Sequence, residues 1–183
     1  MTPLARPPSS RCTTDIKNGT GPASALFINE STPVPAPQEG DALVKVKAFG
    51  LNRMDLIQRE GKYPLPPQAP KTLGVEFSGT IESLGAGSHG DFKVGDAVFG
   101  LAYGGAYAEY IAVSSKMLLH KPDFLSWEQA AGIPETCKRP LVFLNPLPST
   151  DSSRAIPVTL CHCHSDWAVL RKRAPCTPVP GKY

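Results

Sequence analysis

Glycine and proline are distributed along this chain in a way that confines the folded part to its middle. Of the 16 glycines, 12 lie in residues 41–137, which hold only six of the 20 prolines. Glycine reaches positive φ freely, whereas proline cannot donate to a sheet ladder. Many tight turns and few prolines therefore predict a β domain in the middle of the chain, flanked by linker-like segments.

Within the middle part, apolar and polar residues alternate over short stretches, as expected for strands with one buried and one exposed face. Residues 43–50 show it clearly, with Val44, Val46 and Ala48 interleaved with lysines. Further strands are expected at 75–84, 97–100 and 107–113. Short helices are expected at 52–59, opened by Asn52, and at 126–132, opened by a capping box. These elements predict a mostly β fold with short helices, built as a small, mainly antiparallel, partly open barrel.

The charge distribution argues against a nucleic-acid partner, and the lack of a long apolar stretch argues against a membrane-spanning helix. The formal charge of +3 comes from residues 138–183, where seven Lys and Arg face two Asp, while residues 1–137 carry a net −2. A lone basic triplet at 171–173 is not the basic stripe of a nucleic-acid interface. No stretch of 18 apolar residues is present, so no membrane-spanning helix is expected.

The segment GAGSHG at residues 85–90 fits the pattern of a dinucleotide-binding turn, but its context does not. That pattern binds pyrophosphate when the last glycine opens a helix whose amides point at the phosphates. Here DFKVGDAVFG follows, without helical periodicity. The sequence therefore favours a hairpin-like turn over a dinucleotide site.

Five cysteines, three of them in the tail, do not form a disulfide framework and favour a reducing compartment. We expect a cytoplasmic protein, with a mitochondrial presequence in residues 1–14 as the weaker alternative because prolines interrupt it. In the tail, Cys161 and Cys163, joined by Cys137 or Cys176, form a possible zinc site. A tail without a packed structure is the favoured alternative.

Asn52, Asp55 and Tyr63 form the main candidate site. The first two lie three residues apart, hence on one face of the short helix, and Tyr63 follows on a proline-stiffened loop. A phenol beside polar groups can donate a proton or a hydrogen bond to a carbonyl. From spacing alone, a capped helix and a packed Tyr ring remain the favoured explanation.

Four segments agree in order and spacing with one family: residues 42–67, 73–101, 104–113 and 126–136. Over about residues 15–137 the chain resembles the zinc-independent quinone oxidoreductases of the medium-chain dehydrogenase/reductase superfamily, above all the p53-inducible quinone oxidoreductase subgroup. Zinc-dependent relatives carry Cys in LNRMD and His at the position of Val75, so no catalytic metal is expected.

The resemblance implies a GroES-like domain, like the N-terminal domain of alcohol dehydrogenases, followed in the family by a Rossmann domain that holds NADPH. It implies a quinone or enone substrate, with Tyr63 as catalytic proton donor and Asn52, Asp55 and Tyr63 as substrate contacts. Asn52 would also lie near the nicotinamide.

The chain departs from the family at both ends. Residues 1–14 are atypical, and we expect the barrel to lack its first strand pairing. Residues 138–183 hold seven prolines and one glycine, so they predict a disordered tail without a Rossmann domain, arising from a reading-frame change or a retained intron. Residues 15–137 would then form a GroES-like domain that is inactive alone. The alternatives are an isoform that associates with full-length subunits through its exposed domain interface, or a zinc-binding module of the tail.

Overall fold

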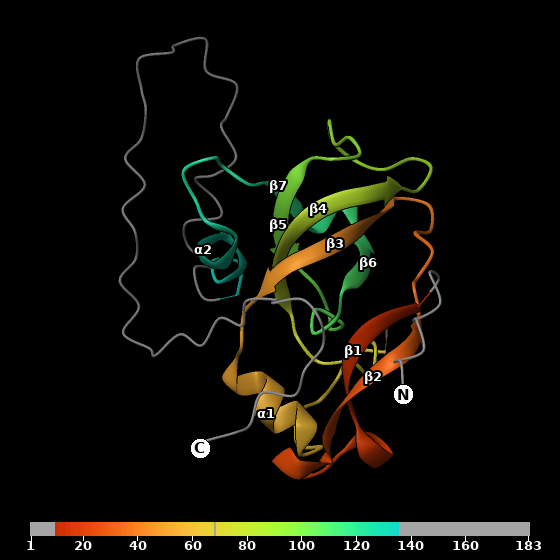
Figure 1. Cartoon of the computed structure of the whole chain (residues 1–183), viewed down its shortest axis with the longest axis vertical. Helices are drawn as coiled ribbons and strands as arrows, with labels where there is room; N and C mark the ends of the chain where they lie inside the picture. The colour runs from red at the N-terminus through yellow and green to blue at the C-terminus, as the bar shows by residue number, and fades with distance from the viewer. Residues whose placement is uncertain (1–9, 68, 136–183) are drawn as a thin grey trace, which may run out of the picture.

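The computed structural model of the chain describes residues 10–67 and 69–135, and two antiparallel sheets carry their fold (Figure 1). The smaller sheet pairs β1 with β2, and the larger has the strand order β6-β3-β4-β5-β7. The strands are β1 (Ser10–Ile16), β2 (Leu26–Pro33), β3 (Asp41–Phe49), β4 (Glu76–Leu84), β5 (Ala97–Leu101), β6 (Tyr110–Ser114) and β7 (Leu118–His120). The helical elements are η1 (Lys17–Gly19), η2 (Ala23–Ala25), α1 (Arg53–Arg59), η3 (Ser115–Met117) and α2 (Trp127–Ala131). The predicted mostly β, antiparallel and open architecture is confirmed.

Most predicted elements lie where the pattern placed them, and the strand expected at 107–113 shows the largest shift. β6 begins only at Tyr110. Before it, the backbone bonds to the smaller sheet: Thr14 N donates to Tyr107 O at 2.8 Å, and Glu109 N donates to Cys12 O at 3.0 Å. These bonds join the two sheets, so the segment before Tyr110 is shared between them.

The expectation that the first strand pairing is missing is wrong. β1 begins at Ser10, inside the segment predicted to be atypical, and pairs with β2 in antiparallel register from Ser10 opposite Pro33 to Ile16 opposite Leu26. The segment SRCTTDI has no regular apolar alternation, which hid the strand. Its pairing depends on β2 and on the bonds to residues 107–109, and these partners are distant in sequence.

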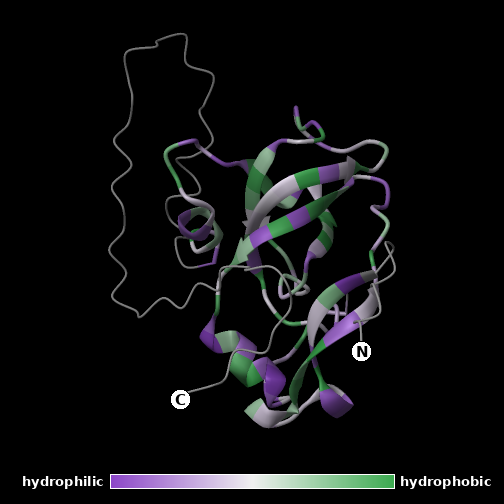
Figure 2. Cartoon of the chain, in the orientation of Figure 1, coloured by the Kyte–Doolittle hydropathy of each residue, from purple (hydrophilic) through white to green (hydrophobic). Residues whose placement is uncertain are grey.

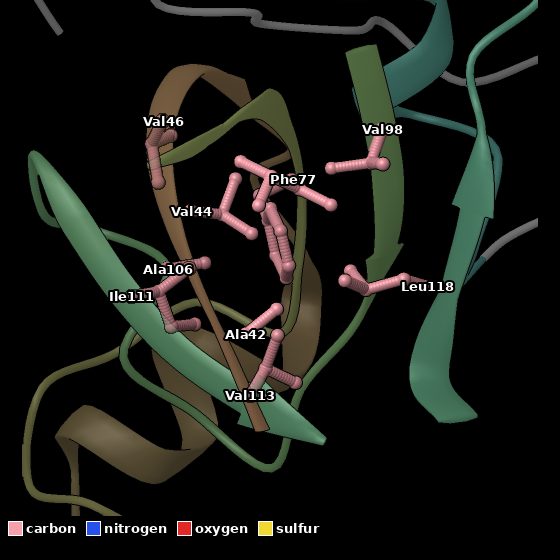
Figure 3. Packing of buried hydrophobic residues seen from close by; sticks show 10 residues of the cluster. Ala42, Val44, Val46, Phe77, Val98, Ala106, Ile111, Val113 and Leu118 are labelled. Carbon is pink, nitrogen blue, oxygen red and sulfur yellow. The ribbon is translucent and has the colours of Figure 1, made fainter. Parts of the chain in front are cut away.

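The sheet buries side chains on both faces at β5. Val98 points into the barrel core, while its neighbour Phe99 packs with Leu125 and Ala130 beneath α2. Successive residues of a strand face opposite sides of the sheet, so β5 contributes Val98 to the apolar cluster on one face and Phe99 to the cluster on the other. Figure 2 shows the resulting mixture of apolar and polar residues along the strands. The barrel core in Figure 3 consists of Ala42, Val44, Val46, Phe77, Ile81, Val98, Ala106, Ile111, Val113 and Leu118.

The GAGSHG segment forms a turn after β4, as predicted. Gly87 and Gly90 adopt φ of +66° and +84°, conformations that glycine reaches without strain. Ser88 Oγ lies 2.9 Å from Asp41 O and 2.7 Å from Gly85 O, so its single hydrogen is shared between two carbonyls and ties the turn to β3. No helix follows it before β5.

The predictions for the tail, including the zinc site at Cys161 and Cys163, lie outside the described residues. Within residues 10–67 and 69–135, no helix has the length and apolar character needed to cross a membrane. All strand pairs of this part are antiparallel, so it contains no parallel β-α-β unit.

Candidate functional site

Helix α1 begins where the sequence predicted, with Asn52 as its N-cap. The Asp55 carboxylate reaches back and accepts a hydrogen bond from Asn52 N at 2.8 Å. This contact satisfies one of the backbone donors that a helix start leaves without an intrahelical partner. The same two residues that were predicted as a site thus also start the helix.

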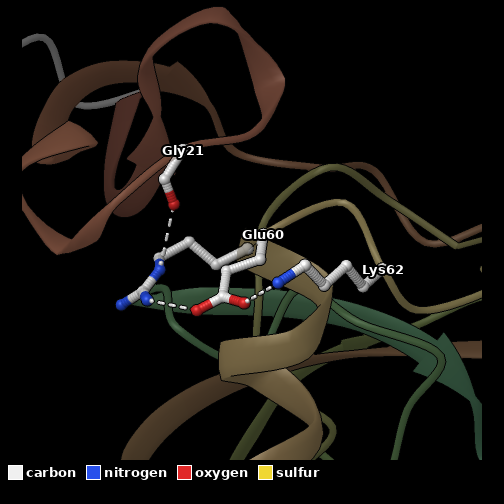
Figure 4. A network of polar contacts seen from close by, with 4 residues as sticks. Gly21, Glu60 and Lys62 are labelled. Carbon is white, nitrogen blue, oxygen red and sulfur yellow. Dashed lines mark hydrogen bonds and ion pairs between the residues drawn. The ribbon is translucent and has the colours of Figure 1, made fainter.

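The other end of α1 is anchored to the segment between β1 and β2 (Figure 4). Gly21 N donates to Arg59 O at 2.8 Å, and Arg59 Nε donates to Gly21 O at 3.2 Å. Lys62 Nζ lies 3.0 Å from Glu60 Oε2, and this hydrogen bond lowers the pKa of Glu60. The exposed ion pair adds little stability. The two hydrogen bonds between Gly21 and Arg59, one from the backbone and one from the Arg59 side chain, fix where the loop after α1 begins.

Asp55 lies at the centre of a buried polar network. Its side chain is 3% exposed, and Oδ2 accepts a 2.7 Å hydrogen bond from the hydroxyl of Tyr107 in addition to the bond from Asn52 N. Oδ1 accepts from Gly74 N at 3.2 Å. All three donors are neutral, and no Lys or Arg of the described residues forms an ion pair with Asp55.

Tyr107 is held over the network by close packing. Its ring lies 4.6 Å from that of Phe49, centroid to centroid. Gly74 has a φ of +93°, and a Cβ atom there would lie 2.3 Å from Tyr107 Cδ1. Glycine at position 74 therefore permits both the positive φ of the backbone and the close approach of the Tyr107 ring.

Glu76 is the second buried carboxylate, with 0% exposure. Oε1 accepts from Asn52 Nδ2 at 2.8 Å, and Oε2 accepts from the backbone N of Glu135 at 2.9 Å. The carboxylate fixes the orientation of the Asn52 amide, because a flipped amide would bring two oxygens together. Asn52 thus joins the two carboxylates, through its backbone to Asp55 and through its side chain to Glu76.

Burial sets the protonation of this network. It raises the pKa of Asp55, against the effect of the three hydrogen bonds that the carboxylate accepts. It also raises the pKa of Glu76, and the negative charges of Glu135 and Asp55 add to that shift. Burial, together with the charge of Asp55, raises the pKa of Tyr107, so its phenol remains protonated and donates. The network thus combines two carboxyl groups of raised pKa with an Asn52 amide of fixed orientation.

Tyr63 lies apart from this network. Its side chain is 37% exposed on the loop after α1, and the described residues give it no hydrogen-bond partner. Large apolar side chains on the same helix and loop are also exposed: Leu56, Ile57 and Leu65. The structure brings Asn52 and Asp55 together but leaves Tyr63 outside, and its catalytic role stays a prediction.

Sequence reasoning missed two members of the network, Glu76 and Tyr107. Residues 75–84 were read as a strand with apolar residues on one side and polar residues on the other, yet both Glu76 and Ser78 are buried. Ser78 Oγ donates to Trp127 O at 2.6 Å, so α2 covers this part of the polar side. A single carboxylate within the otherwise uncharged LGVEFSG was the available signal.

The described residues do not form a complete site for a metal or a dinucleotide. No cluster of three His, Cys, Asp or Glu side chains that could hold a metal ion occurs among them. A dinucleotide pyrophosphate is typically bound at the N-terminus of a helix that follows a glycine-rich turn. The GAGSHG turn leads into β5 instead. The GAGSHG turn therefore does not fit the phosphates of a dinucleotide.

Comparison with protein-family models shows that residues 38–123 match the family described as the alcohol dehydrogenase GroES-like domain. The synaptic vesicle membrane protein VAT-1 homolog-like of Mus musculus is 37% identical over 116 residues, which are 63% of this chain and 27% of that protein. The quinone oxidoreductase of Pongo abelii is 35% identical over 114 residues, which are 62% of this chain and 34% of that protein.

Among solved structures, Escherichia coli quinone oxidoreductase complexed with NADPH superposes with a TM-score of 0.57 at 32% identity, over 67% of this chain and 36% of that one. This chain spans about a quarter to a third of the length of the two curated relatives. The predicted resemblance to quinone oxidoreductases is confirmed at the level of this domain, and the p53-inducible subgroup stays a prediction.

Proposed function

Because residues 38–123 of the chain are an alcohol dehydrogenase GroES-like domain, we propose that it supplies the substrate side of an NADPH-dependent reductase of quinones or conjugated carbonyls. Relatives named quinone oxidoreductase, and a structural neighbour complexed with NADPH, support the reaction class and the cofactor. The hydride would come from NADPH, and the substrate oxygen would take up a proton from Tyr63 or from water.

One observation carries this proposal: Tyr63 is 37% exposed on the loop after α1, and Leu56, Ile57 and Leu65 of the same helix and loop are exposed as well. A flat, apolar carbonyl compound needs such a surface together with a hydrogen-bond donor. Asn52 lies at the start of the same helix, and the network below fixes its amide. The proposal therefore assigns substrate contact to residues 52–65, with Tyr63 as the donor.

Titration of the purified chain with a tetramethyl-substituted benzoquinone, whose ring positions are blocked against thiol addition, tests this assignment. We expect amide NMR signals of residues 52–65 to shift. Tyr63→Phe should weaken binding by about two- to tenfold, the value of one neutral hydrogen bond. Tyr103→Phe is the matched control, because Tyr103 is 54% exposed on a different loop. Equal binding by Tyr63→Phe, or shifts confined to other segments, would contradict the proposal.

We further propose that residues 10–67 and 69–135 do not retain NADPH by themselves, since neither of their α-helices follows a glycine-rich turn that could bind its phosphates. Without a bound donor the reaction loses the effective molarity of held reactants, worth roughly 7–11 kcal/mol. Titrating the chain with NADPH and following Trp127 and Trp167 fluorescence should show no saturation at micromolar concentrations. Saturable binding, or NADPH oxidation by the chain in the presence of a quinone, would refute this part.

Association with another oxidoreductase subunit is the second candidate function. The exposed side chains of Leu56, Ile57 and Leu65 favour it, because exposed apolar surface in soluble proteins marks interaction sites. Co-purification with a full-length relative should then depend on these residues. Loss of co-purification in Leu56→Lys, with the fold retained, would support association; unchanged co-purification would count against this surface.

A further inference from the structure

We propose that Glu76 is a positioning residue that clamps the candidate site to the point where the chain continues past α2. Its two carboxylate oxygens face different partners: Oε1 accepts from the side-chain amide of Asn52, and Oε2 accepts from the backbone N of Glu135. One carboxylate thereby links the N-cap of α1 to the segment that follows α2. The inference goes beyond the proposed reaction, since it concerns how the site is held rather than what it reduces.

The burial of Glu76 indicates that its carboxylate serves more than packing. Its side chain has 0% exposure, and no Lys or Arg of the described residues pairs with it. A buried carboxylate without a cationic partner is unfavourable, and an apolar residue at this strand position would avoid that penalty. What an apolar residue lacks is two acceptor oxygens, and both neighbours of Glu76 are N–H donors. A carboxylate, whose two oxygens both accept hydrogen bonds, matches these two N–H donors.

The clamp is strongest while Glu76 is ionised. Protonation removes the negative charge of the carboxylate, so both hydrogen bonds that it accepts become neutral ones, which are weaker. The titratable groups that face Glu76 are Asp55 on α1, Glu135 after α2 and Tyr107 before β6. The charges of Asp55 and Glu135 favour the protonated form of Glu76. The link to Glu135 should therefore weaken as the pH falls through the raised pKa of Glu76.

An NMR titration of the full, isotopically labelled chain tests the clamp. The carboxyl carbon of Glu76 reports its own protonation. We expect the backbone amide of Glu135 and the side-chain amide of Asn52 to titrate with that same midpoint, above the ordinary value of 4.5. The backbone amide of Asn52 instead bonds to Asp55 and serves as an internal reference for the other carboxylate.

Glu76→Gln should abolish both titrations, because Gln offers one acceptor oxygen and does not ionise. Hydrogen exchange at the Glu135 amide should become at least about tenfold faster, as expected when a charged hydrogen bond is lost. Glu82→Gln is the matched control, since Glu82 lies on the same strand with an exposed side chain, and it should leave both signals unchanged.

Three results would overturn the inference: different midpoints for the two amides, a midpoint unrelated to that of the Glu76 carboxyl, or persistence of both titrations in Glu76→Gln. If Glu76→Gln does not fold, the titration of the unmodified chain decides alone. Shared midpoints support the clamp, and independent midpoints refute it. None of these readouts depends on NADPH or a quinone, so failure of the clamp and failure of the proposed function are distinguishable.

Discussion

Replacing Tyr107 by Phe removes a single hydroxyl and should lower the free energy of unfolding by about 1.5–3 kcal/mol while Asp55 is ionised, the range for a hydrogen bond to a charged group. The hydroxyl lies 2.7 Å from Asp55 Oδ2, and Asp55 is 3% exposed, so water cannot readily replace it. The substitution keeps the ring against Phe49. Because Asp55 retains the bonds from Asn52 N and Gly74 N, the loss is confined to one contact.

Urea unfolding followed by tryptophan fluorescence measures this change. Tyr103→Phe is the control and should stay within about 0.5 kcal/mol of the unmodified protein, because its hydroxyl is exposed. Burial raises the pKa of Asp55, so lowering the pH converts its carboxylate to the neutral acid. The hydrogen bond then becomes a neutral one, worth about 0.5–1.5 kcal/mol, and the difference between Tyr107→Phe and the unmodified protein should narrow. A change below about 0.5 kcal/mol at neutral pH, or one that widens as the pH falls, would refute this reasoning.

Three further predictions can be checked by the same unfolding assay. Gly74→Ala should lower the free energy of unfolding by about 1–3 kcal/mol more than Gly95→Ala does. Both glycines have positive φ, but only at Gly74 would a Cβ atom lie 2.3 Å from the Tyr107 ring. Equal losses of stability in the two variants would mean that the contact with Tyr107 relaxes freely. Burial raises the folded-state pKa of Glu76, so ionisation of Glu76 lowers the free energy of unfolding. This loss of stability is absent at low pH, where Glu76 is protonated in both states, and it grows as the pH rises. The free energy of unfolding of Glu76→Gln relative to the unmodified protein should therefore increase with pH, and a flat or falling difference would show that Glu76 is not desolvated. Ser126→Ala removes the acceptor for the Gln129 backbone N–H at the start of α2 and should lower the free energy of unfolding by about 1 kcal/mol. An unchanged free energy of unfolding would indicate that packing alone holds this helix.

Local sequence signals located most of the elements. The alternation around Val44 and Val46 predicted β3 and its buried face, and the capping residues Asn52 and Ser126 predicted the starts of both α-helices. These signals work because strand faces and helix caps depend on residues within a few positions of one another. β1 was missed for the opposite reason, since its partners are β2 and residues 107–109.

The candidate site divides in the same way. Their spacing predicted that Asn52 and Asp55 lie on one helical turn, and in the structure Asn52 N donates a hydrogen bond to the Asp55 carboxylate. No local pattern joined them to Glu76 or Tyr107, because a residue in a strand and another before β6 meet only when the sheet forms. Tyr63, which the sequence placed with the pair, is exposed on the following loop.

The sequence by itself determined the mainly antiparallel β class, the short capped helices, and the turn at GAGSHG, since each follows from backbone preferences and periodicity over a few residues. Tertiary structure alone decided that two carboxylates are buried with only neutral donors around them. Whether a polar side chain is exposed or enclosed depends on what packs over it, and here α1, α2 and the Tyr107 segment come from distant parts of the chain. The raised pKa values of Asp55 and Glu76 are therefore a property of the assembled fold.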